Sequence, residues 1–212
     1  MNKQIDPPPA AAFDVTPCIL LLLASALFLG TAAWLYWPAP EMAFRTDDSP
    51  AAWLSSAQLW GMALIALRLF RERALPPVLC LWLGAAMVAM SFDEQFMLHE
   101  HWKYECVQWF AACRHAWVTE LPMLLVAVLG LATVFWLHRC LQARSARVLL
   151  WAAVGVGLFA LLLRFTQQPA DLLPYKAALL VLAEALFAGV LLGVTRRDQP
   201  CVGAPGQVHS TS

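Results

Sequence analysis

The chain is 212 residues long, and 61% of its residues are hydrophobic whereas only 13% are charged. Soluble domains are about 45–50% apolar and about 25% charged, so this composition excludes an ordinary soluble enzyme and a disordered chain. The 14 basic residues equal the 14 acidic residues in number, so we expect no nucleic-acid partner. The sequence is that of an integral membrane protein, which has the lipid bilayer as its surroundings.

Six stretches are long and apolar enough to cross a bilayer as helices, which requires about 17–25 mostly apolar residues. They are residues 18–37, 51–67, 75–92, 121–137, 148–163 and 177–194. These runs are apolar on every side, whereas the strands of a membrane barrel alternate in polarity. We therefore predict an all-α, polytopic bundle of six transmembrane helices in residues 17–197. It lies between a cytoplasmic N-terminal arm, residues 1–16, and a disordered cytoplasmic tail, residues 198–212.

The first stretch is interpreted as an uncleaved signal anchor. Its apolar run is long, and the only nearby basic residue, Lys3, lies far from that run. A cleaved signal peptide, which has a basic segment directly before a shorter apolar segment, is the alternative.

Lys and Arg concentrate in the cytoplasmic connections of membrane proteins, so their distribution predicts the orientation. One side of the bundle holds nine of them: Lys3, Arg68, Arg71, Arg73, Arg139, Arg144, Arg147, Arg196 and Arg197. The other side holds five: Arg45, Lys103, Arg114, Arg164 and Lys176. We predict a multi-pass protein of a bacterial-type inner (plasma) membrane, with both termini in the cytoplasm.

The longest polar interval, residues 93–120, lies on the predicted outer face and begins with an unusual set of ionisable side chains. If the third helix continues unbroken into this interval, Asp93 and Glu100 fall on one line along it. Glu94 and His101 then lie beside that line, whereas His99 points away from it. A continuous helix therefore concentrates three carboxylates and one imidazole on a single face.

Acidic and histidine side chains crowded beside lipid are costly unless a cation, a proton or a water-filled cavity relieves their repulsion. Such clusters suit divalent metals such as zinc, and the candidate ligands are Asp93, Glu94, His99 and His101. The candidate catalytic residues are Asp93, Glu94 and Glu100, which would activate water beside the metal. The alternative is an ordinary helix end, where charged residues leave the membrane and meet water.

Polar residues elsewhere are candidate partners of this cluster. Glu184 lies in the middle of the sixth span, where an ionised carboxylate is costly, so we expect it to be protonated or paired. Gln58 lies at a similar depth in the second span and is its expected hydrogen-bond partner. Arg164 is the expected counter-charge for the carboxylates of the third helix. Glu120 precedes the fourth span, where a carboxylate suits the helix dipole.

Two of the six cysteines, Cys106 and Cys113, fall in the predicted outer interval. An oxidising compartment on that side permits a disulfide between them. Their spacing differs from the C-x-x-C of thiol oxidants. A structural disulfide and two free thiols both remain open at this point.

Ser91, Asp93, Glu94, His99 and Glu100 form the run S-x-D-E-x4-H-E. This run resembles a signature of small six-helix bacterial membrane proteins of unassigned function. Those proteins also carry an acidic residue in their last helix. That resemblance implies the fold but no activity.

A second similarity covers shorter pieces. Residues 99–105, H-E-H-W-K-Y-E, and residues 120–123, E-L-P-M, are similar to parts of the alkaline ceramidases, membrane hydrolases with a zinc site. The resemblance implies hydrolysis of a lipid at zinc. The chain departs from that family at Thr119, which stands in place of an Asp, and its final helices lack the family's later pair of histidines.

Three classes of function follow. The first is a metal-dependent lipid hydrolase that uses the acid and histidine side chains of residues 93–101. The second is a proton- or cation-coupled transporter, in which Glu184 and the Asp93–Glu94 pair take up and release ions. The third is a non-catalytic membrane subunit or assembly partner that binds another membrane protein through the outer loop, residues 93–120.

Overall fold

The computed structural model describes residues 13–45, 49–163 and 175–194. Within these ranges six helices are long and apolar enough to cross a membrane, and no strand is present. They are α1 (Thr16–Leu35), α3 (Pro50–Arg71), α4 (Pro77–Phe96), α7 (Leu121–Cys140), α8 (Arg144–Leu162) and α9 (Tyr175–Gly193). The shorter elements are α2 (Met42–Arg45), α5 (Leu98–Trp109), the 3₁₀ turn η1 (Ala111–Arg114) and α6 (Ala116–Thr119). The prediction of an all-α, multi-pass membrane bundle is confirmed.

Proline and short polar side chains determine where the long helices begin. Pro17, Pro50, Pro77 and Pro122 each lie in a first turn, where the missing N–H group costs nothing. Ser49 caps α3 by accepting a hydrogen bond from the backbone amide of Ala52 at 3.3 Å. The helices therefore begin close to the predicted residues.

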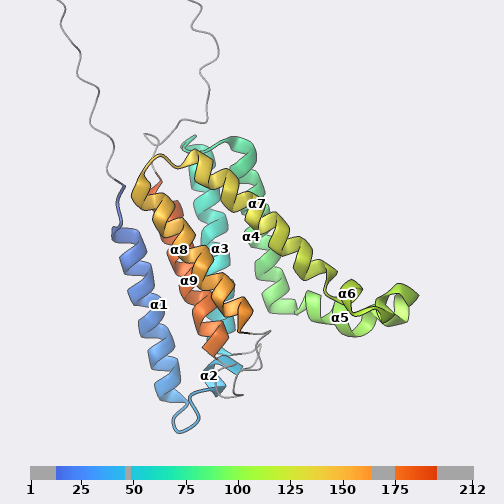
Figure 1. Ribbon diagram of the computed structural model, residues 1–212. Coiled ribbons are helices and arrows are strands. Elements are labelled where there is room, and N and C mark those ends of the chain that lie inside the picture. The colour runs from blue at the N-terminus through green and yellow to red at the C-terminus, as the bar shows by residue number, and fades with distance from the viewer. Residues whose placement is uncertain (1–12, 46–48, 164–174, 195–212) are drawn as a thin grey trace, which may run out of the picture.

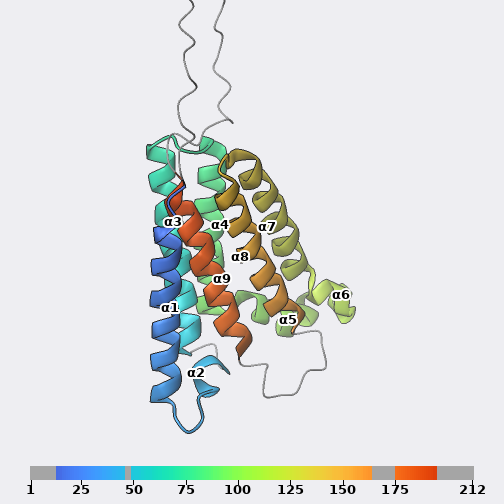
Figure 2. The ribbon, with the colours of Figure 1, turned by 60° about the vertical axis from the view of Figure 1, so that its left-hand side comes forward.

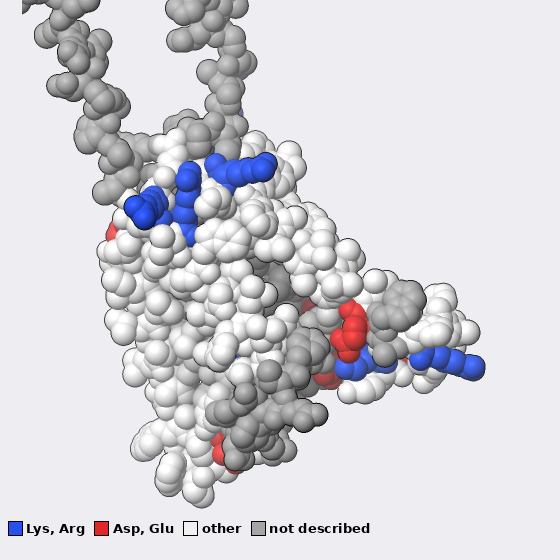
Figure 3. All heavy atoms as spheres, in the orientation of Figure 1, with Lys and Arg blue, Asp and Glu red and all other residues white. Residues whose placement is uncertain are grey.

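The two ends of the bundle differ in charge. α3 and α7 end where α4 and α8 begin, and this end carries Arg68, Arg71, Arg73, Arg139, Arg144 and Arg147. Figure 3 shows the blue basic side chains gathered there, so we call it the basic end. α1 begins and α9 ends at the basic end as well (Figure 1).

The opposite end carries α5, η1 and α6, residues 98–119, which extend sideways from the bundle (Figure 1). We call these elements the side arm and this end the side-arm end.

α3 and α9 form the centre of the bundle. α3 packs against α4 and α9, and α9 lies between α1 and α8 (Figure 2). Gly189 of α9 makes the approach of α1 possible, because a Cβ there would lie 2.5 Å from the Cα of Cys18. Close helix pairs in membranes use small residues in this way.

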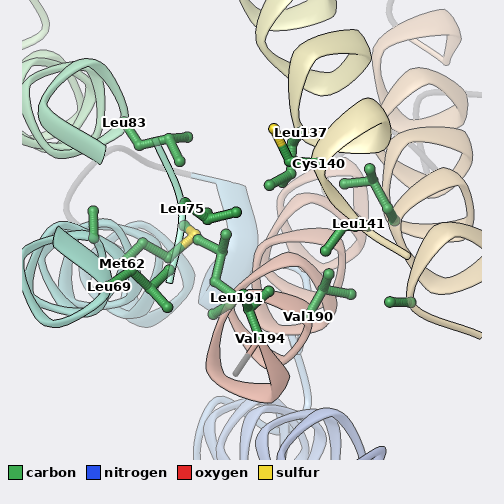
Figure 4. Packing of buried hydrophobic residues seen from close by; sticks show 14 of the residues in the cluster. Met62, Leu69, Leu75, Leu83, Leu137, Cys140, Leu141, Val190, Leu191 and Val194 are labelled. Carbon is green, nitrogen blue, oxygen red and sulfur yellow. The ribbon is translucent and has the colours of Figure 1, made fainter. Parts of the chain in front are cut away.

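Two apolar clusters lie along the bundle axis. The larger cluster fills the half nearer the basic end and includes Met62, Leu69, Leu79, Leu83, Leu137 and Leu191. Figure 4 shows how part of this cluster packs. The smaller cluster joins α1, α2, α3 and α9 nearer the side-arm end and includes Leu29, Phe44, Ala51 and Val181. On α1, α3 and α9, polar side chains lie between the residues of the larger cluster and those of the smaller cluster.

Candidate functional site

The third span does not continue as one helix into the following interval. α4 ends at Phe96, and Met97 adopts a left-handed conformation with φ 49° and ψ 43° before α5 begins at Leu98. A side chain in this conformation costs roughly 1–2 kcal/mol, so the break requires compensating contacts. The prediction of an unbroken helix, with three carboxylates and His101 on one face, is wrong.

Asp93 supplies contacts that stabilise the break. Its Oδ1 accepts a hydrogen bond from the backbone amide of His99 at 2.8 Å, and its Oδ2 lies 2.9 Å from Nδ1 of the same residue. The first amides of a helix have no partner within it, and a carboxylate that accepts from them acts as a cap. An unbroken helix would point His99 away from Asp93, whereas in the structure the two are direct partners.

Two further pairs of ionisable side chains lie in the interval. Nδ1 of His101 lies 3.3 Å from Oε1 of Glu105 at an exposed position. Nζ of Lys103 forms an ion pair with Oε1 of Glu120 at 2.9 Å. Glu120 thus links the side arm to the start of α7, in addition to its expected place beside the helix dipole.

The metal site stays a prediction. Among the residues that the structure describes, no group of three or more His, Cys, Asp or Glu side chains is close enough to hold a metal ion. Asp93 and His99 are paired, and Glu94 and Glu100 are partly buried nearby in sequence. The predicted counter-charge, Arg164, lies outside the described residues, as do the two predicted terminal segments, apart from residues 13–16.

Cys106 and Cys113 form a disulfide, with their Cα atoms 5.8 Å apart. Trp102 packs against the two buried cysteines and Val118, and its Nε1 donates a hydrogen bond to the carbonyl oxygen of Val118 at 3.3 Å. The disulfide therefore connects α5 to η1 and gives the side arm a small core of its own. Of the two alternatives left open, the structure shows the disulfide.

A second set of polar side chains lies within the bundle. The hydroxyl of Ser55 donates to Oε1 of Glu184 at 2.9 Å. Gln58, the expected partner of Glu184, instead donates from its Nε2 to the hydroxyl oxygen of Ser25 at 2.7 Å. Ser55 and Gln58 are three residues apart on α3. Ser55 contacts α9, whereas Gln58 contacts α1.

The third contact of α3 is with α4. The hydroxyl oxygens of Ser56 and Ser91 lie 2.8 Å apart, and both residues are buried. α3 thus makes a polar contact with three of the helices that it packs against, α1, α4 and α9. We call the six residues of these contacts the polar layer; they are Ser25, Ser55, Ser56, Gln58, Ser91 and Glu184.

Sequence reasoning misses Ser25 and the role of Ser91 in the polar layer. The only signal in the sequence is a lone serine inside the leucine-rich first span, together with the serine that precedes the Asp93–Glu94 pair. A single hydroxyl in a span is also compatible with a bond to its own helix backbone. Only the arrangement of the helices shows which partner it contacts.

Two oxygen atoms of the polar layer accept no hydrogen bond from any described residue. They are Oε2 of Glu184 and Oε1 of Gln58, and neither is accessible to solvent. Glu184 is the central residue of the 19-residue helix α9, where an ionised acidic side chain costs about 2.5–3.5 kcal/mol to insert. Nearly all buried polar atoms of folded proteins have a hydrogen-bond partner, so these two oxygens are exceptions among the described residues.

Comparison with models of known protein families, with curated proteins and with solved structures gives no match. The resemblances to six-helix bacterial membrane proteins and to alkaline ceramidases therefore rest on their short motifs and stay predictions.

Proposed function

We propose that this protein is a proton- or cation-coupled carrier and that Glu184 takes up the coupling ion. The observation that carries the proposal is the carboxyl group of Glu184 in the middle of a membrane span. It accepts one hydrogen bond, from Ser55, and its second oxygen has no partner among the described residues. Ionisable side chains within spans mark ion pathways and proton relays, and the partner of this one is a hydroxyl that can adjust to either protonation state.

Entry from the side-arm end is part of this proposal. Glu94 lies in the last turn of α4 and is near enough to Glu184 to act on it electrostatically. Ser56 and Ser91 link α3 to α4 close by. These groups would conduct an ion from the side-arm end to Glu184. The larger apolar cluster occupies the half nearer the basic end, so release on that side requires the cluster to repack.

The distribution of charges supports an orientation for this proposal. The basic end carries arginines from α3, α7 and α8, and such residues face the cytoplasm. We place the basic end in the cytoplasm of a bacterial-type inner membrane and the disulfide-linked side arm outside it, where cysteines are oxidised. The ion would then enter from outside.

Carboxyl labelling in the membrane tests the proposal. Dicyclohexylcarbodiimide is an apolar reagent that couples to protonated carboxyl groups, so it should label Glu184 in the full-length protein in vesicles. Labelling, located by mass spectrometry, should fall as the pH is raised and be absent at this position in Glu184→Gln. If Glu184 remains unlabelled in acidic and alkaline buffers alike, it exchanges no proton and the proposal is overturned.

The Asp93–His99 pair favours a second function, hydrolysis of a lipid at its headgroup. A carboxylate bonded to Nδ1 of an imidazole orients the ring, and the other ring nitrogen can then act as a general base toward water. Both side chains are about one-third exposed, 34% and 28%, at the end of a span. A zinc ion held by the predicted ligands Asp93, Glu94, His99 and His101 would supply further activation.

A further inference from the structure

We infer that the polar layer contains a sodium site, formed between α1, α3 and α9 by oxygen atoms of Ser25, Ser55, Gln58 and Glu184. The inference deepens the proposed function, on which it rests, by naming the ion that Glu184 exchanges for its proton. It depends on where these four side chains lie, on which of their oxygens lack partners and on the charge that they carry.

The four residues lie at nearly the same depth. Cys18 of α1 meets Gly189 of α9, and the two helices run in opposite directions. Ser25 is seven residues beyond Cys18 and Glu184 is five residues before Gly189, which at about 1.5 Å per residue places them within roughly one helical turn of each other. Ser55 contacts Glu184 directly at 2.9 Å.

Gln58 completes the set from α3. Residues three apart on a helix are neighbours, with Cβ atoms about 5–6 Å apart, so Gln58 lies beside Ser55. The Nε2 of Gln58 donates to the hydroxyl oxygen of Ser25 at 2.7 Å. The Oε1 of Gln58 takes no part in this contact. Oε1 of Gln58 and Oε2 of Glu184 are both inaccessible to solvent and accept no hydrogen bond within the described ranges. The contacts of Ser55 with Glu184 and of Gln58 with Ser25 hold both side chains where α1, α3 and α9 meet, and there we place the cation.

The chemistry of the ligand atoms determines which class of ion fits the site. All four residues offer oxygen, which suits hard cations rather than zinc or copper. The set carries one carboxylate, so a monovalent ion leaves no net charge in the membrane, whereas a divalent ion would leave an uncompensated positive charge. The two unpartnered oxygens are inaccessible to solvent, which favours a small ion that has shed its water shell, and sodium meets each of these conditions.

Sodium and the proton compete for the same carboxylate. α1 carries no charged residue between Thr16 and Leu35, and the arginines of α3 and α8 lie at the basic end. On α9 itself Lys176 is the second residue, at the side-arm end, and Glu184 follows eight residues later. On α4 the acidic residues are Asp93, which pairs with His99, and Glu94, and both lie in its last turn at the side-arm end.

Protection from labelling tests the site in the intact protein. Sodium chloride should protect Glu184 of the wild type from dicyclohexylcarbodiimide, whereas potassium chloride and choline chloride at the same ionic strength should not. Equal protection by potassium or choline, or none by sodium, overturns the sodium site. Labelling that persists at Glu184 in that case still supports the proton carrier, whereas absence of labelling under every condition overturns both.

Variants then locate the ligands. Gln58→Leu and Ser55→Ala should each raise the sodium concentration needed for half-protection at least about tenfold, as loss of a supporting ligand does in other ion sites. Ser56→Ala is the matched control, because Ser56 is adjacent on α3 but contacts Ser91 of α4. It should leave the sodium dependence unchanged. An equal shift in all three variants overturns the assignment of the ligands, and the wild-type result stands even if a variant fails to fold.

Discussion

Asp93 and His99 are joined twice across the break between α4 and α5, once through the backbone amide of His99 at 2.8 Å and once through its ring at 2.9 Å. The first amides of α5 have no hydrogen-bond partner within the helix. The carboxylate of Asp93 accepts a hydrogen bond from one of them, that of His99. It also fixes the direction of the imidazole. At this junction α5 turns out of the bundle, so the side arm leaves at an angle rather than extending the span (Figure 1).

Replacing Asp93 with Ala should weaken this junction. Loss of a cap costs about 0.5–2 kcal/mol, so the free energy of unfolding should fall by about 1 kcal/mol, and the amide of His99 should exchange its hydrogen faster. Thermal unfolding in detergent and hydrogen exchange measure the two effects. Glu105→Ala, in the side arm at an exposed position, is the control and should change stability by less than about 0.5 kcal/mol. Equal effects of the two variants would show that Asp93 is no cap.

The six spans can be predicted from the sequence because each is a long apolar run, and the bilayer thickness alone sets the length required. The break at Met97 cannot, because methionine is a good helix former and no glycine or proline marks the turn. The contact of Asp93 with a residue six positions later stabilises the break, and that contact follows only from the folded backbone.

The candidate site, too, can be predicted from the sequence only in part. The cost of placing a carboxylate within a span is enough to single out Glu184 from the amino-acid sequence. The sequence pairs it with Gln58 rather than with its actual partner Ser55, because depth along α3 is readable from the sequence whereas the rotation of α3 against α9 is not. Residues three apart on α3 contact different helices, so a small rotation exchanges their partners.

Reporter fusions test the orientation. Fusions within residues 70–74 and 140–146 and at residue 205 should report the cytoplasm, because arginines at the basic end resist translocation. Fusions at residues 45 and 108 should report the outside. A cytoplasmic signal from position 108 would reverse the bundle and place the side arm in the cytoplasm.

Metal analysis tests the hydrolase hypothesis. If Asp93 and Glu94 help to hold zinc, the detergent-purified wild type should retain a divalent metal. The double variant Asp93→Asn with Glu94→Gln should lose it, because neutral amides are poor ligands for such ions. Glu105→Gln serves as the control and should keep the metal. A wild-type protein without metal, or a double variant with full content, leaves the Asp93–His99 pair as a structural contact.

Gly189 allows a further test that separates helix packing from ion binding. A Cβ at this position would lie 2.5 Å from the Cα of Cys18 and 2.8 Å from its backbone nitrogen, atoms that cannot rotate away. Gly189→Ala should therefore push α1 from α9 and lower the free energy of unfolding by about 1–3 kcal/mol, as overpacked cores do. Gly130→Ala is the matched control, since nothing lies within 4 Å of its added Cβ.

The same pair of variants should differ in sodium dependence. Ser25 of α1 contacts Gln58, so a displaced α1 removes one side of the proposed site. The sodium concentration that protects Glu184 from the carbodiimide should therefore be higher in Gly189→Ala than in the wild type. Gly130 lies on α7, away from the polar layer, and Gly130→Ala should behave as the wild type. If Gly189→Ala loses stability but keeps the wild-type sodium dependence, α1 contributes no ligand, and the site would have to be formed by α3 and α9 alone.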